Sequence, residues 1–140
     1  MAKARCLCGT LRYELDGPFS AMMHCHCSMC RKHHGTGFAT FVAAPITGFR
    51  WISGEDRLVR YRSSPNAVRS FSSVCGSVGP STIPEHGIVV APAACLEGEL
   101  GIKPQSHIFV ASMAPWDAIT DALPQHDASP PEFQAQGVSR

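Results

Sequence analysis

The chain has 140 residues, a formal net charge of +1 and 44% hydrophobic residues, which indicates one soluble globular domain with a real core. Its 12 lysines and arginines are scattered, so the sequence lacks the clustered basic face that nucleic-acid binding requires. No run approaches the roughly 18 apolar residues of a membrane-spanning helix, so we expect neither nucleic acid nor a membrane as a partner. The sequence does not indicate an oligomeric state.

The predicted elements are short strands separated by turns, as the 12 glycines and 11 prolines indicate. Residues 10–15 alternate apolar and polar side chains, which predicts a strand that buries Leu11, Tyr13 and Leu15 on one face. Further strands are predicted at residues 36–43, 48–53, 57–62, 68–72, 87–91 and 107–112.

The two strands 48–53 and 57–62 are predicted to form a hairpin around Gly54-Glu55-Asp56. No helix of convincing length is predicted. The segment 125–140 contains prolines and glutamines and has little to bury, so we expect it to be a tail that is extended or mobile. The predicted organisation is therefore one mainly β domain, residues 1–124, followed by this tail.

The densest group of chemical side chains is His24-Cys25-His26-Cys27-Ser28-Met29-Cys30. Thiolate and imidazole are the ligands that zinc prefers. Cys25 and Cys27 share a face in extended backbone, and we expect a short turn, rather than a helix, to bring Cys30 back to them. Three cysteines leave zinc one short of its usual four ligands, so either a distant residue closes the site or the fourth position is open for chemistry.

The remaining cysteines suggest a second site. Cys6 and Cys8 lie near the N-terminus and Cys75 lies far along the chain, so together they could form a metal staple between strands. Cys95 stands alone and is interpreted as a core residue. Because the first residues have no apolar stretch typical of a secretion signal, seven cysteines favour a reducing, cytoplasmic location and metal binding or catalysis over disulfides.

The histidines and basic residues near the cysteines are further candidates for the site. His24, His26 and His33 are candidate proton donors because they are near the three cysteines in sequence. The basic residues are interpreted as solvated strand surface that could hold a carboxylate-bearing ligand if some of them border the metal site; they are Arg31, Lys32, Arg57, Arg60 and Arg62.

Three motifs resemble those of a known family. C-x-C-G at Cys6, Cys8 and Gly9, C-H-C-x-x-C-R-K from Cys25 to Lys32, and F-x-x-x-C-G-S from Phe71 to Ser77 are similar to the glutathione-dependent formaldehyde-activating enzyme family, whose domain centromere protein V shares. The resemblance covers roughly residues 5–124. It implies a zinc-stapled single domain of several small antiparallel sheets, two zinc sites, and carbon–sulfur lyase activity on a glutathione adduct of formaldehyde.

The resemblance also implies the ligands. Cys25, Cys27 and Cys30 would hold the catalytic zinc, with the open position taken by the substrate thiol, such as that of glutathione. Cys6, Cys8, residue 72 and Cys75 would hold the structural zinc. Residue 72 is serine here, which is a poor substitute for a thiolate, so this site is expected to be weakened.

Two alternatives stay open. The first is the same chemistry on another thiol or a related aldehyde, because the loops that would choose the substrate, residues 78–87 and 97–106, carry no readable signal. The second is a non-catalytic, zinc-stapled interaction module, since one fold can host either role.

Overall fold

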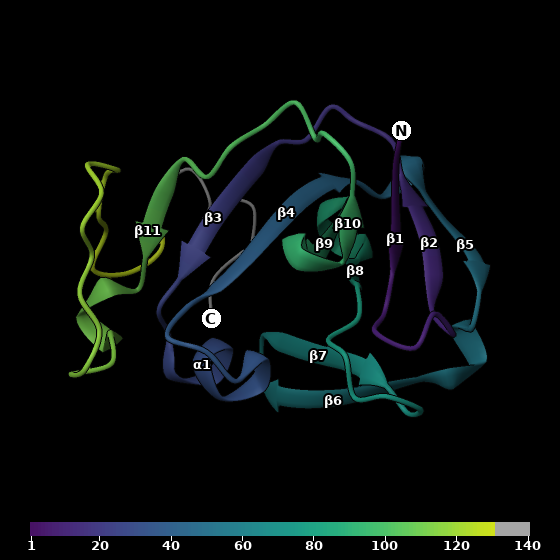
Figure 1. Ribbon diagram of the computed structural model, residues 1–140, viewed down its shortest axis with the longest axis horizontal. Helices are drawn as coiled ribbons and strands as arrows, with labels where there is room; N and C mark the ends of the chain where they lie inside the picture. The colour runs from purple at the N-terminus through teal and green to yellow at the C-terminus, as the bar shows by residue number, and fades with distance from the viewer. Residues whose placement is uncertain (131–140) are drawn as a thin grey trace.

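Three small β-sheets and one short helix form the part of the chain that the computed structural model describes, residues 1–130 (Figure 1). This confirms the predicted mainly β class. The strands are β1 (Ala2–Arg5), β2 (Arg12–Leu15), β3 (Ala21–Cys25), β4 (Ala39–Pro45), β5 (Phe49–Ser53), β6 (Leu58–Ser64), β7 (Ala67–Ser72), β8 (Ser81–Ile83), β9 (Ile88–Pro92), β10 (Leu96–Glu97) and β11 (Ser106–Ile108). The α-helix is α1 (Ser28–His34), and short 3-10 turns cover Ile46–Gly48, Glu55–Arg57, Pro84–His86, Ala93–Cys95 and Val110–Ser112.

The strands form three separate sheets and are almost all antiparallel. One has the order β10-β1-β2-β5, the second β11-β3-β4-β9-β8, and the third is the pair β6-β7. Neighbouring strands are antiparallel except β3 and β11, which run parallel. In Figure 1 the β6-β7 pair and α1 lie together along one end of the two larger sheets. No helix within residues 1–130 is long and apolar enough to cross a bilayer.

The buried face predicted for residues 10–15 is confirmed, although the strand β2 begins only at Arg12. Leu11, Tyr13 and Leu15 are 0%, 2% and 0% exposed, and Tyr13 and Leu15 pack in one core cluster with residues of β4 and β9. Tyr13 also lies against Phe49 and Trp51 of β5, with ring centroids 5.7 and 5.6 Å away. The apolar face of β2 therefore joins the N-terminal sheet to the core.

The predicted hairpin between residues 48–53 and 57–62 is wrong. Both strands exist, but β5 pairs with β2 whereas β6 pairs with β7, so they belong to different sheets. The cause is Gly54, which adopts φ +84° and leads into the turn Glu55–Arg57. A Cβ on Gly54 would lie 2.2 Å from the Thr10 carbonyl oxygen, so the glycine allows the chain to press against that loop and change direction.

A strand was predicted at residues 107–112; the observed strand, β11, begins one residue earlier and ends at Ile108. β11 ends at Ile108 because Phe109 adopts φ 55°, after which the chain turns through Val110–Ser112. Later residues return to β11: the His107 N–H donates to the Pro124 carbonyl and the His126 N–H donates back to the His107 carbonyl, both at 2.9 Å. Of the predicted tail 125–140, residues 131–140 lie outside the described part of the chain.

Candidate metal centres

The first cysteine group is built by the junction of β3 and α1. Cys25 ends β3, Cys27 is the N-cap of α1, and Cys30 lies in its first turn. The Cys30 N–H donates to the Cys27 sulfur at 3.2 Å, so a thiol takes the place of the usual capping oxygen. The expectation that a turn rather than a helix would carry Cys30 is therefore wrong, because the cap itself brings the two sulfurs together.

The three sulfurs of this group, the Cys25 triad, lie within 4.8 Å of one another and could hold a metal ion. All three residues are buried. Hydrogen bonds from Cys25 and Cys30 lower the pKa of the Cys27 thiol, whereas hydrogen bonds with Cys27 and Cys30, and then burial, raise the pKa of Cys25. Without a cation the group therefore favours one thiolate, and a divalent ion is what would allow all three to ionise. The donor set fits zinc.

Arg69, on β7, is the charged neighbour of the Cys25 triad. Its Nη1 donates to the Cys30 sulfur at 3.2 Å, and its Nε donates to the Ser63 hydroxyl at 3.2 Å. Burial alone would lower the pKa of Arg69, but the charge and hydrogen bond of Cys30 raise it above its ordinary value. A fixed cation thus faces the sulfurs.

The Cys25 triad lines a cavity of about 400 Å³. Polar and charged side chains from four elements surround the cavity, and they are His33, His34, Arg62, Asn66, Arg69, Glu85 and His86. Its apolar wall includes Phe41, Val90 and Phe109. The cavity is therefore large enough for a small organic molecule and carries more positive than negative side chains.

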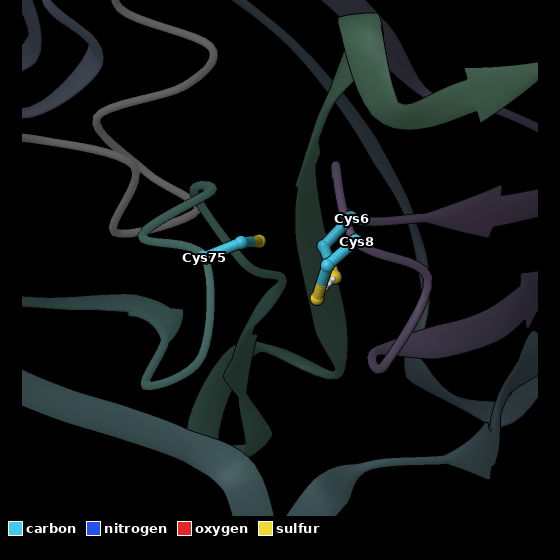
Figure 2. A group of neighbouring side chains, drawn as sticks. All are labelled: Cys6, Cys8 and Cys75. Carbon is cyan, nitrogen blue, oxygen red and sulfur yellow. Dashed lines mark hydrogen bonds between the residues drawn. The ribbon is translucent and has the colours of Figure 1, made fainter.

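The second cysteine group, Cys6, Cys8 and Cys75, also has its sulfurs within 4.8 Å of one another and could hold a metal ion. Figure 2 shows Cys75 reaching from its own loop toward Cys6 and Cys8, which come from the segment after β1. Hydrogen bonds from the Ser77 side chain and backbone and from the Cys8 backbone lower the pKa of the Cys75 thiol to about 5. This second group therefore joins distant parts of the chain, as a staple would.

Comparisons with known proteins place this arrangement. The family described as glutathione-dependent formaldehyde-activating enzyme matches residues 1–112. The chain belongs to that family. A crystal structure of a Rhodobacter sphaeroides protein, a structural genomics target, has 26% sequence identity and a TM-score of 0.58, and the match covers 73% of this chain and 97% of that one. The search of curated proteins finds no match.

Within this formaldehyde-activating family fold, two of the predicted proton donors lie away from the cavity. His24 and His26 alternate with Cys25 and Cys27, so their side chains leave the opposite face, where Phe38 and His107 contact them. His33, the third candidate proton donor, instead lines the cavity together with His34.

Sequence reasoning missed a buried relay behind the cysteines. His26 Nε2 lies 2.8 Å from His107 Nδ1, and His107 Nε2 lies 2.9 Å from Asp121 Oδ2. With neutral rings, the acceptance by the carboxylate from His107 assigns Nε2–H to both histidines. The backbone of His26 is held as well, since its N–H donates to the Ile108 carbonyl and its carbonyl accepts from Arg31. His26, the residue between Cys25 and Cys27, is therefore held by three hydrogen bonds: one from its ring, one from its N–H group and one to its carbonyl.

Acid is expected to destabilise this family member through His34. Burial, then His33 and Arg69, lower the pKa of His34 to about 4 from the ordinary value of 6.5. Between these values the unfolded chain binds the proton and the folded chain does not, so the free energy of unfolding falls as the pH drops below 6.5. At about pH 5 the loss in the free energy of unfolding that is due to His34 is about 1–2 kcal/mol, after allowance for the partial exposure of the ring.

Urea unfolding of the wild type and of His34→Gln at about pH 7.5 and about pH 5 checks this expectation. The glutamine variant should lose less stability on acidification than the wild type. Equal losses in the two proteins would show that His34 does not carry the effect.

Proposed function

We propose that the protein is a zinc-dependent carbon–sulfur lyase that acts on a glutathione adduct of formaldehyde or of a related aldehyde. Membership of the formaldehyde-activating family supports the reaction class. The observation that carries the proposal is that the Cys25 triad lines a cavity of about 400 Å³ rather than closing on a fourth protein ligand within residues 1–130. Closed sites are typical of structural zinc, and a vacant position is typical of catalytic zinc.

The bonds that change are few. In the synthetic direction the sulfur of glutathione forms a C–S bond with the carbonyl carbon of formaldehyde, and the thiol proton ends on the carbonyl oxygen. The lyase direction reverses both changes. A zinc ion on the Cys25 triad would supply stabilisation of the substrate thiol as a thiolate, lowering its pKa from about 8.5.

The protein's own side chains supply the remaining steps. Burial and then Arg69 lower the pKa of His33, against an opposing contribution from the Ser70 backbone, so the neutral ring is favoured and can accept a proton. His33 is thus placed to take the thiol proton and return it to the carbonyl oxygen. The guanidinium groups of Arg62 and Arg69 suit the carboxylates of glutathione, and the cavity walls hold both reactants together.

Exchange spectroscopy of glutathione and formaldehyde tests the proposal. The zinc-loaded protein should accelerate formation and breakdown of the adduct, S-hydroxymethylglutathione, above the uncatalysed rate. Other thiols and aldehydes, measured in the same way, would show which pair the protein prefers. No acceleration with glutathione or with any of them would favour the non-catalytic interaction module.

Replacing Arg69 is expected to reduce this exchange rate. Three thiolates around a divalent ion leave a charge of −1, which Arg69 offsets through its contact with Cys30. Loss of a partner that supports a metal ligand typically lowers activity about 10–100-fold. The exchange rate of Arg69→Met should fall by this factor, and Arg69→Lys should retain part of the rate. Arg60→Met, which removes an exposed arginine on β6 outside the cavity, serves as the matched control and should keep the wild-type rate. Equal rates for Arg69→Met and this control would contradict the assignment.

A further inference from the structure

The second cysteine group has three sulfurs and a serine where a fourth would be expected. Ser72 is 1% exposed, and its hydroxyl accepts from the N–H groups of Val74 and Cys75 at 3.2 and 3.3 Å. This hydroxyl shapes the turn that carries Cys75, but a neutral oxygen is a poor ligand for a thiolate-preferring ion. The site therefore needs a fourth donor from elsewhere.

Cys95 lies near both segments that form this site, the one that carries Cys6 and Cys8 and the one that carries Cys75. β10 pairs with β1 so that Leu96 faces Ala4, which places the preceding residue, Cys95, alongside the end of β1 as the chain approaches Cys6. On its other side the Cys95 sulfur lies 3.8 Å from the Val78 carbonyl, and Val78 pairs with Phe71, the residue before Ser72. Burial and the neighbouring Cys6 and Cys75 raise the pKa of the Cys95 thiol.

The Cys95 sulfur lies outside the group of three that fall within 4.8 Å of one another, so it would have to rotate toward them. The contact that holds it is weak, since a thiol is a poor donor and the distance to the Val78 oxygen is long. In Figure 2 the Cys75 side chain points toward those of Cys6 and Cys8.

Tyr13 gives an independent reason for a thiolate at this position. Its side chain is 2% exposed, and its hydroxyl has no hydrogen-bond partner in the part of the chain that the structure describes. Burial, then the charges of Cys95 and Cys6, raise the pKa of this phenol, so these two sulfurs lie in its surroundings. A buried donor without an acceptor is costly, and an ionised Cys95 would provide the acceptor.

We propose that Cys95 is the fourth ligand of a divalent, thiolate-preferring ion held by Cys6, Cys8 and Cys75, and that the Tyr13 hydroxyl donates to its thiolate. Cys95 then takes the role that Ser72 cannot fill, and the site becomes a closed tetrahedral set of four thiolates. This reverses both the interpretation of Cys95 as a simple core residue and the expectation that Ser72 weakens the site. The proposal is independent of catalysis at the Cys25 triad.

Cobalt substitution with metal-release measurements tests the proposal. In cobalt-loaded protein, absorption by thiolate-to-metal charge transfer grows with the number of bound sulfurs. Cys95→Ser should lower this absorption and release one metal equivalent to a chelator at least about tenfold faster than the wild type. Wild type and Ser72→Cys should release it at similar rates, because the wild type already supplies four thiolates and a tetrahedral ion has no position for a fifth. A Cys95→Ser variant that matches the wild type would overturn the proposal.

The double variant Cys95→Ser/Ser72→Cys separates a ligand from a packing residue. A thiol returned at position 72 should restore both the absorption and slow release, even if Cys95→Ser alone fails to fold. A double variant as labile as the single one, or as poorly folded, would show that Cys95 acts by packing. Tyr13→Phe should release the metal several-fold faster while remaining folded, and unchanged release would overturn the assigned role of its hydroxyl.

Discussion

Cys27→Ser is expected to reduce catalysed exchange between glutathione and formaldehyde to the uncatalysed rate. Cys27 is the only member of its triad that both caps α1 and accepts hydrogen bonds from the other two thiols among residues 1–130. Loss of a residue that supports a metal ligand typically lowers activity about 10–100-fold, so loss of a direct ligand should lower the exchange rate more than about 100-fold. Serine keeps the capping geometry but is a poor ligand, so the helix should persist while the metal is lost.

Metal content checks this result independently of the rate. Zinc should fall from two equivalents to one per chain, because Cys6, Cys8, Cys75 and the proposed Cys95 are untouched, and these serve as the internal control. A variant that keeps two equivalents and the wild-type exchange rate would rule out the Cys25 triad as the active site. A variant that loses one equivalent but keeps the rate would assign catalysis elsewhere.

His107→Phe is expected to lower the free energy of unfolding by about 2–4 kcal/mol, as measured by urea unfolding. Phenylalanine approximates the ring volume, so the change isolates hydrogen bonding. His107 is 1% exposed and lies between His26 and Asp121. The buried His26, whose Nδ1 already has no partner within residues 1–130, would then lose its contact at Nε2 as well.

His126→Phe provides the matched control, because the hydrogen bonds that His126 makes with Val110 and His107 come from its backbone. A substitution of that kind usually changes stability by less than about 0.5 kcal/mol. If His107→Phe behaved like this control, the relay would have no energetic role. Loss of metal from the Cys25 triad in His107→Phe, at a denaturant concentration where the chain stays folded, would show that the relay also holds the link between Cys25 and Cys27.

Local patterns in the sequence were sufficient for the parts of the fold that depend on local periodicity. The alternation at Leu11, Tyr13 and Leu15 identified three buried side chains in and just before β2, and the spacing of Cys25, Cys27 and Cys30 identified three sulfurs that the structure brings together. The same reasoning failed at Gly54, where a hairpin was predicted. Strand partners there are chosen by packing against the Thr10 loop, which lies far away in sequence.

The parts of the site that could not be predicted depend on residues from distant segments. His107 contacts His26 across 81 positions, and Arg69 contacts Cys30 across 39. Arg69 was not among the basic residues singled out, although its place in β7, beside the third cysteine motif, is a signal that could have found it. Arg62 was expected on the solvated surface unless it bordered the site, and it does line the cavity.

The pairing of residues 124–126 with β11 has a consequence for how the protein is handled. The family match ends at residue 112, yet the backbone of Pro124 and His126 covers the outer side of β11 at His107, and Asp121 closes the relay. A shortened chain ending at Ser112 would expose the N–H and C=O groups of β11 as an open strand edge. Such edges recruit strands from other molecules, so a fragment cut at the family boundary would self-associate more readily than the longer chain.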